Sequence, residues 1–145
     1  MTKFETALLH LLRAALHSEI PNDPKLDPEE WGALLKRAET HKLLPIILDA
    51  AIRLPSCRAS LAQGLPAWEQ NASHDPDEGR SDWRSSVFAQ VNRQVVQENE
   101  FLNLILALRE RGLEPLVVKS AVCRKLYPKP LLRPSVDDDL LIPPE

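Results

Sequence analysis

Three consecutive aspartates, Asp137–Asp139, run directly into the apolar segment 140–142. Side chains alternate between the two faces of a β-strand, so Asp137 and Asp139 should point the same way if this segment is extended. At a strand rise of about 3.3 Å per residue, their Cα atoms should lie roughly 6.5 Å apart. Two carboxylates at this spacing repel each other unless a cation lies between them, and Mg²⁺ commonly binds one or two carboxylates together with substrate phosphates. The pair is therefore a candidate metal site for phosphoryl transfer, and the alternative is a solvated acidic turn or an exposed strand end.

A second candidate group could bind phosphate. Lys119 and Ser120 follow a short apolar run and precede a predicted helix, whose N-terminal N–H groups would favour an anion. Lys119 would add a point charge suited to a phosphate oxygen. Arg133, between two prolines, would present its guanidinium to phosphate or to the aspartates. The alternatives are a helix N-cap, a surface lysine, and a surface arginine paired with Asp138.

Short elements must position these residues. The run 116–118 is rich in β-branched residues and too short for a helix, so it predicts a buried strand. The sequence then indicates a brief helix over 121–127, an extended proline-held connection over 128–134, and a second strand over 136–142.

The preceding part of the chain predicts helices. Apolar residues recur at three- and four-residue intervals in four segments, at about 4–15, 28–38, 43–54 and 87–111. The second of these has Asp27 as a cap, Pro28 at the first helical position and Glu30 three residues past the cap. Gly112 supplies the left-handed stop of the last one.

The segment at about 64–82 is polar and acidic, without apolar periodicity, and is expected to be a mobile loop. The fold class is therefore mainly α with a small α/β C-terminal part. We expect a helical region over 1–112 that contains this loop, and a strand-bearing part over 113–145.

The composition excludes some classes of function. The chain has 145 residues, 43% of them hydrophobic and 27% charged, as in an ordinary globular protein. A formal net charge of −3 gives no reason to expect a broad nucleic-acid or membrane surface. Cys57 and Cys123 have neither metal nor redox spacing, and the N-terminal segment reads as neither a signal peptide nor a membrane span. We expect a cytoplasmic protein with reduced thiols.

The order of the C-terminal parts resembles the nucleotidyltransferase signature of the DNA polymerase β superfamily. More narrowly, Leu116–Ile142, with the run "LYPKPLLRP" before "DDDLLI", is similar to an uncharacterised bacterial nucleotidyltransferase family whose members read roughly "LKG…LYPDP..RP..DIDLLV". The segments "HKLLPIIL" and "LRERGLEPLVVK" look like that family's leading helices. The resemblance implies a helical N-terminal lobe followed by the first two strands of a nucleotidyltransferase-type sheet, with 113–145 as a partial nucleotidyltransferase core.

The resemblance also implies a function. Asp137 and Asp139 would bind Mg²⁺ and support transfer of a nucleotidyl group from a nucleoside triphosphate to an unknown acceptor. Lys119 and Ser120 would hold the triphosphate.

The sequence departs from the family pattern at three points. Ser120 replaces a glycine, and Asp138 replaces an apolar residue that would face the core. An unpaired charge there costs several kcal/mol, so we expect Arg133 or Lys125 to pair with Asp138, or the strand to begin one residue later. The superfamily's third carboxylate comes from a later strand, so we expect an N-terminal portion that is weakly active or inactive by itself.

The alternative function belongs to another class. A two-stranded sheet leaves exposed edges that invite another protein or a second copy of the chain. On this reading, the chain is a non-catalytic helical interaction module that keeps a vestigial nucleotidyltransferase edge.

Overall fold

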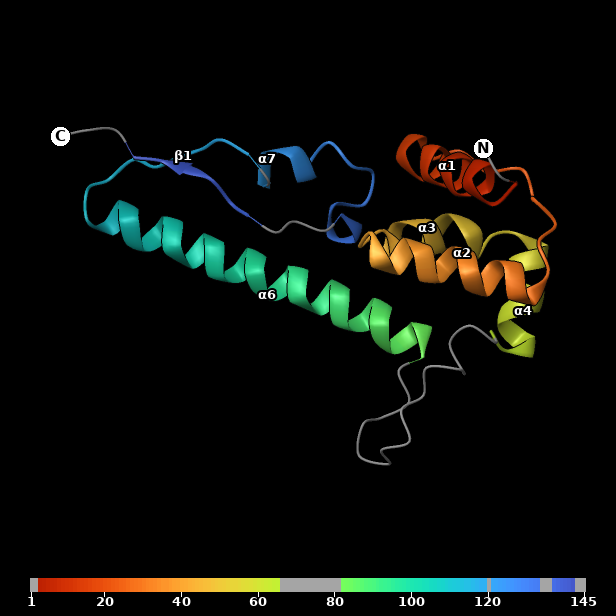
Figure 1. Cartoon of the computed structure of the whole chain (residues 1–145). Coiled ribbons are helices and arrows are strands. Elements are labelled where there is room, and N and C mark those ends of the chain that lie inside the picture. Colours follow the sequence, from red (N-terminus) through yellow and green to blue (C-terminus); the bar gives the residue numbers. More distant parts are fainter. Residues whose placement is uncertain (1–2, 66–81, 120, 134–136, 143–145) are drawn as a thin grey trace, which may run out of the picture. The chain divides into compact units, whose positions relative to one another are not determined.

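The computed structural model describes residues 3–65, 82–119, 121–133 and 137–142. It is mainly helical, with a two-stranded antiparallel sheet near its C-terminal end, as the sequence predicts (Figure 1). In chain order the elements are α1 (Lys3–His17), α2 (Pro28–Thr40), α3 (Leu44–Ala51), α4 (Pro55–Gln63), α6 (Trp83–Glu110), β1 (Leu116–Val117), α7 (Ala121–Arg124), the 3₁₀ turn η1 (Pro130–Leu132) and β2 (Leu140–Leu141). The chain divides into two compact units, Met1–Ala89 and Gln90–Glu145. The predicted loop at about 64–82 falls almost entirely outside the described residues.

The start of α2 shows why these residues form a helix. The Asp27 carboxylate accepts a hydrogen bond of 2.8 Å from the Glu30 N–H, and the Glu30 carboxylate accepts one of 3.1 Å from the Asp27 N–H. Pro28 occupies the first turn, where its missing N–H costs nothing. This reciprocal capping box confirms the predicted start of the helix.

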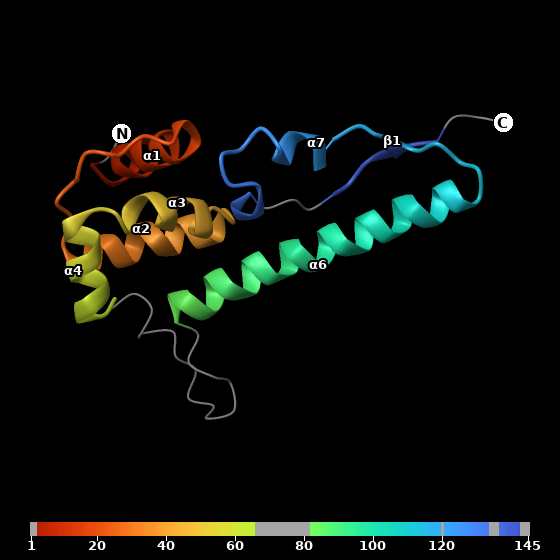
Figure 2. The same ribbon diagram turned by 180° about the vertical axis from the view of Figure 1, so that it is seen from behind.

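The core of the first unit forms where α1, α2, α3 and α4 pack together (Figure 2). Trp31 on α2 is completely buried and is the largest of its fully buried side chains. The other side chains with 2% exposure or less are Leu11, Leu34, Leu35, Ala38, Leu44, Ile47, Ala50, Ala51 and Cys57. Burial raises the pKa of the Cys57 thiol to about 12, and the negative charge of Asp23 adds to that effect. Cys57 is therefore a packing residue and not a reactive thiolate.

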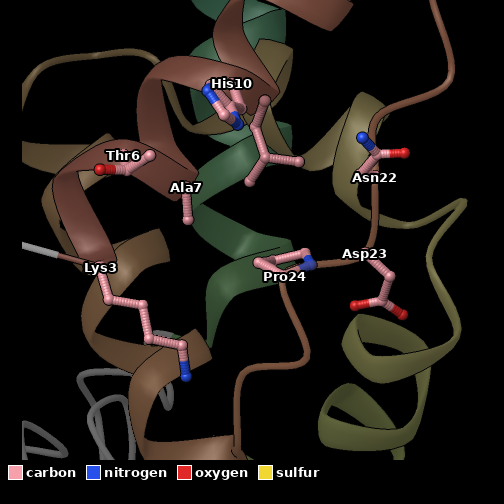
Figure 3. Close-up of a pocket in the computed structure, with 8 residues that line it drawn as sticks. Lys3, Thr6, Ala7, His10, Asn22, Asp23 and Pro24 are labelled. Carbon is pink, nitrogen blue, oxygen red and sulfur yellow. The ribbon is translucent and has the colours of Figure 1, made fainter.

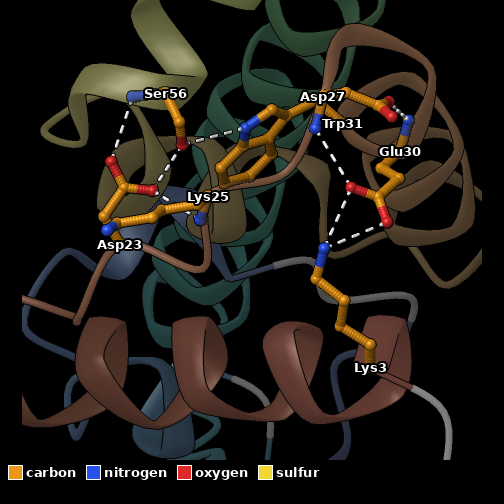
Figure 4. A network of polar contacts seen from close by, with 7 residues as sticks. All are labelled: Lys3, Asp23, Lys25, Asp27, Glu30, Trp31 and Ser56. Carbon is orange, nitrogen blue, oxygen red and sulfur yellow. Dashed lines mark hydrogen bonds and ion pairs between the residues drawn. The ribbon is translucent and has the colours of Figure 1, made fainter.

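Helix α4 was not predicted from the sequence, and its N-terminus depends on a residue far away in the chain. Pro55 stands in its first turn, but the N-cap residue Leu54 makes no side-chain cap hydrogen bond. Instead, Asp23 in the α1–α2 connection accepts a hydrogen bond of 3.0 Å from the Ser56 N–H and another from the Ser56 hydroxyl. The Trp31 indole N–H donates to the same hydroxyl at 3.2 Å (Figure 4). Asp23 therefore caps α4 from the connection, and the sequence pattern could not show this.

The carboxylate of Asp23 should make the free energy of unfolding depend on pH in the acidic range. Burial raises its pKa, but hydrogen bonds from the Ser56 hydroxyl and from the N–H groups of Lys25 and Ser56 outweigh that effect and hold it below the usual 3.8. Because the pKa of Asp23 is lower in the folded than in the unfolded state, its carboxylate stabilises the fold fully at pH values above the unfolded-state pKa. This stabilisation is lost as the pH falls through the folded-state pKa.

We expect Asp23→Asn to lower the free energy of unfolding by about 1–2 kcal/mol at pH 7, because three hydrogen bonds lose their charged acceptor. The difference from the wild type should shrink below pH 3.8 and vanish below the folded-state pKa. Urea denaturation followed by circular dichroism at several pH values measures both effects. Glu19→Gln is the control, because Glu19 is exposed and its removal should change little. A difference that stays constant from pH 7 to pH 2 would contradict the assigned role.

The second unit begins within α6. Gly112 follows this helix with φ of 79°, and its N–H donates to the carbonyl of Arg109 at 2.9 Å, so the predicted left-handed stop is confirmed. Three details differ from the sequence prediction. The first strand, β1, was expected to be buried, but Leu116 is 62% exposed because a two-stranded sheet leaves this side chain uncovered. The connection expected to be extended contains the turn η1, and the second strand is limited to Leu140–Leu141. Pro130 at the start of η1 fixes a backbone angle that suits a 3₁₀ turn as well as an extended chain.

Candidate functional site

The two short strands bring the candidate residues to one place. β1 and β2 pair antiparallel, with Leu116 opposite Leu141 and Val117 opposite Leu140. The pairing continues one step further, because the Val118 N–H donates to the Asp139 carbonyl at 3.1 Å. The main chain therefore sets Asp139 beside the residue that precedes Lys119.

The exposure of the three aspartates alternates along the chain. Asp137 and Asp139 are exposed, whereas Asp138 is half-buried. The Oδ1 atom of Asp138 is inaccessible to solvent and accepts no hydrogen bond within the described part of the chain. The expected pairing of Asp138 with Arg133 or Lys125 is therefore not found there. The expected strand over 136–142 was too long, because all three aspartates precede β2.

Lys119 lies next to one of the two candidate metal ligands. Its ammonium nitrogen is 3.4 Å from Oδ2 of Asp139, and the two side chains are 66% and 51% exposed. The carbonyl of Lys119 accepts a hydrogen bond of 3.1 Å from the Val122 N–H in the first turn of α7. Lys119 therefore contacts Asp139 through its side chain and the first turn of α7 through its main chain. Ser120 lies outside the described residues.

Arg133 follows the turn η1. Its N–H donates to the Pro130 carbonyl at 3.2 Å. Its guanidinium carbon lies 5.2 Å from the ring centroid of Tyr127, a distance typical of a cation–π contact. This contact restricts the side chain of Arg133 on the segment that leads to the aspartates, so a guanidinium presented there would be partly ordered.

A buried arginine that sequence reasoning missed anchors α7. Arg124 is 2% exposed, and its Nη1 lies 3.5 Å from Oε2 of Glu98 on α6. The Arg124 Nε is buried without a hydrogen-bond partner among the described residues. This ion pair holds the helix that begins directly after the Lys119 turn. Nothing in the local sequence separates Arg124 from the exposed Lys125, so no signal could have found it.

The two carboxylates of Asp137 and Asp139 are ligands of the kind that Mg²⁺ binds. Asp137 and Asp139 are hard oxygen donors, and Mg²⁺ commonly takes one or two protein carboxylates and fills its remaining positions with water and phosphate. A cation, the Lys119 ammonium, already lies beside Asp139. Within residues 3–65, 82–119, 121–133 and 137–142, no three His, Cys, Asp or Glu side chains gather as a metal-binding group. Within this part of the chain, the candidate site therefore offers the two carboxylates of Asp137 and Asp139.

The comparison with known families decides the assignment. A family profile described as "Uncharacterised nucleotidyltransferase" matches residues 27–145. The chain belongs to this nucleotidyltransferase family. The match runs from the capping box of α2 through the aspartates, so it covers most of the helical part and all the candidate site residues. No curated protein and no solved structure matches the chain significantly.

A pocket elsewhere contains none of the expected site residues. It has a volume of about 280 Å³ and lies between α1 and the α1–α2 connection (Figure 3). Lys3, Thr6, Ala7, His10, Leu11, Asn22, Asp23 and Pro24 line it. All of these precede the part of the chain that the family profile matches. Two of its charged groups are engaged, because Lys3 pairs with Glu30 and Asp23 caps α4.

No helix in the described ranges combines the length and the apolar character needed to cross a lipid bilayer.

Proposed function

We propose that this chain is an Mg²⁺-dependent nucleotidyltransferase that moves a nucleotidyl group from a nucleoside triphosphate to an acceptor. The observation that carries the proposal is the family match over residues 27–145, together with the pairing that sets Lys119 beside Asp139. The acceptor's nucleophilic atom would form a bond to the α-phosphorus, and the bond between that phosphorus and the pyrophosphate oxygen would break. Both free cysteines, Cys57 and Cys123, support the expected cytoplasmic location.

Each candidate residue has a role in this proposal. The carboxylates of Asp137 and Asp139 would hold Mg²⁺, which would supply charge neutralisation at the phosphates and at the attacking oxygen. Lys119 would place its ammonium against the triphosphate, Ser120 would contribute to holding the triphosphate, and Arg133 would add a second cation. The apolar residues of β2 would fix the aspartates through the strand pairing.

The proposed activity is weak. Catalysis of nucleotidyl transfer depends mainly on charge stabilisation at the phosphates, and two-metal sites need enough ligands to hold both cations. The described residues offer only a two-carboxylate site and no gathering of three metal-binding side chains. We therefore propose that turnover at this two-carboxylate site is slow.

The test is a transfer assay with purified chain, Mg²⁺ and each of the four α-³²P-labelled nucleoside triphosphates. Slow, Mg²⁺-dependent labelling of acceptors in a cell extract is expected, and Asp137→Asn and Asp139→Asn should each reduce it at least tenfold. Glu100→Gln on α6 is a matched control, because this exposed carboxylate should leave labelling unchanged. Labelling that persists in both aspartate variants would refute the assignment.

The exposed apolar side chains of the second unit favour one other function. On β1, β2 and the residues that follow them, Leu116, Val118, Leu141 and Ile142 are 62%, 49%, 57% and 50% exposed. A two-stranded sheet with such side chains would bind another chain along its edge. Absence of transfer in the assay above, together with concentration-dependent association in light scattering, would support an interaction module instead.

A further inference from the structure

We propose that Lys119 is an exchangeable counter-ion: it neutralises Asp139 in the empty site and moves to the triphosphate when Mg²⁺ binds. This inference rests on the proposed function, because it requires Asp137 and Asp139 to be metal ligands. It adds a positioning role for Lys119 that the family assignment does not supply. The starting observation is the distance of 3.4 Å between the Lys119 ammonium and the Asp139 carboxylate.

The pair is well suited to open. Both side chains are more than half exposed, and such ion pairs contribute little to stability because water competes for both partners. The hydrogen bond from the Val118 N–H to the Asp139 carbonyl already joins these two segments, so the strand pairing does not need the ion pair. Lys119 can therefore leave Asp139 without disturbing the backbone.

Once the ion pair with Asp139 has opened, the Lys119 ammonium would also be placed to bind the triphosphate. A lysine has a flexible four-carbon side chain, so its ammonium can swing several ångströms while its Cα stays fixed. Its carbonyl is held by the first turn of α7, which keeps the Cα at the proposed phosphate-binding turn. A divalent cation beside two carboxylates would displace a single ammonium from Asp139, and the incoming phosphates would offer that ammonium new oxygen partners.

A fixed structural ion pair between Lys119 and Asp139 predicts other effects of removing Lys119. If Lys119 only tied the two segments together, its removal would weaken folding slightly and leave both ligands' affinities alone. If Lys119 exchanges between Asp139 and the triphosphate, its removal should raise the affinity for the metal, because the ammonium no longer competes for Asp139. The same removal should lower the affinity for the nucleotide, because a phosphate contact is lost. The two affinities must then change in opposite directions.

The experiment measures Mn²⁺ binding to the full chain by electron paramagnetic resonance of free Mn²⁺, without nucleotide. We expect Lys119→Met to bind Mn²⁺ roughly twofold to fivefold more tightly than the wild type, the range set by an exposed ion pair. Lys119→Arg keeps the charge and should bind Mn²⁺ like the wild type. At saturating Mn²⁺, α,β-methylene-ATP should bind to Lys119→Met at least threefold more weakly.

Lys125→Met is the matched control, because Lys125 is an exposed lysine of the same unit and, among the described residues, forms no ion pair with the aspartates. It separates loss of the Lys119 contact from loss of a nearby positive charge, so both of its affinities should stay within error of the wild type. Equal effects of the two lysine variants would overturn the inference.

The aspartate variants separate failure of the inference from failure of the proposed function. If Asp137→Asn and Asp139→Asn abolish Mn²⁺ binding but Lys119→Met leaves it unchanged or weaker, the counter-ion role is wrong and the metal site stands. If Mn²⁺ binding is absent or indifferent to both aspartates, the proposed function fails, and the inference fails with it.

Discussion

Trp31→Ala is expected to lower the free energy of unfolding of the first unit by about 3–5 kcal/mol, the usual cost of removing a fully buried aromatic side chain. Trp31 has no exposed surface, and the helix that carries it, α2, packs against α1, α3 and α4. Its indole N–H also donates to the Ser56 hydroxyl. The variant therefore loses apolar packing, leaves a cavity and removes a hydrogen bond that supports the capped end of α4.

Two further variants separate these contributions. Trp31→Phe keeps an aromatic ring but loses the N–H, so it should cost less than Trp31→Ala. Ile20→Ala removes a large apolar side chain that is 78% exposed, and should change stability by less than 0.5 kcal/mol, which is about the usual surface effect. Circular dichroism at 222 nm in a urea titration measures all three without relying on tryptophan fluorescence. A loss below about 1 kcal/mol in Trp31→Ala would show that the first unit does not pack around this residue.

The second large effect is expected at the buried ion pair of the second unit. Glu98→Ala should destabilise this unit by about 2–4 kcal/mol, because it leaves the guanidinium of Arg124 buried without its counter-charge. Arg124→Met should cost less than about 1 kcal/mol, since the Glu98 carboxylate is 44% exposed and water can solvate it. The two halves of one ion pair are thus expected to have unequal effects.

Hydrogen exchange of the amides at 94–124 measures this inequality directly in the second unit. Glu100→Ala serves as the control, because it removes an exposed glutamate of the same helix and should leave protection unchanged. If Arg124→Met were the more damaging variant, the aliphatic part of the side chain would dominate and the charge would matter little.

Much of the fold could be predicted from local signals. The capping box at Asp27 and Glu30 fixes the start of α2 because the interaction is contained within four residues. The stop at Gly112 is equally local. Helix α4 was missed because its cap, Asp23, lies 33 residues before Ser56, and no local pattern encodes such a contact.

The candidate site could be predicted only in outline. The order of Lys119 and the aspartates in the sequence indicated a shared site, and the strand pairing places Lys119 beside Asp139. The length of the second strand was overestimated, because a run of three aspartates followed by three apolar residues does not show where the strand pairing stops. The burial of Arg124 and the unsatisfied Oδ1 of Asp138 depend on packing between segments distant in sequence.

The long-range cap on α4 has a consequence for folding. Asp23 belongs to the connection after α1, Trp31 to α2 and Ser56 to α4, so one hydrogen-bonded cluster spans three segments. α4 is nine residues long, too short to persist alone in water, and its first turn has no side-chain cap of its own. It should therefore form only after the connection has docked, late in folding and together with the rest of the unit. The Asp23→Asn variant would then unfold faster while folding at nearly the wild-type rate.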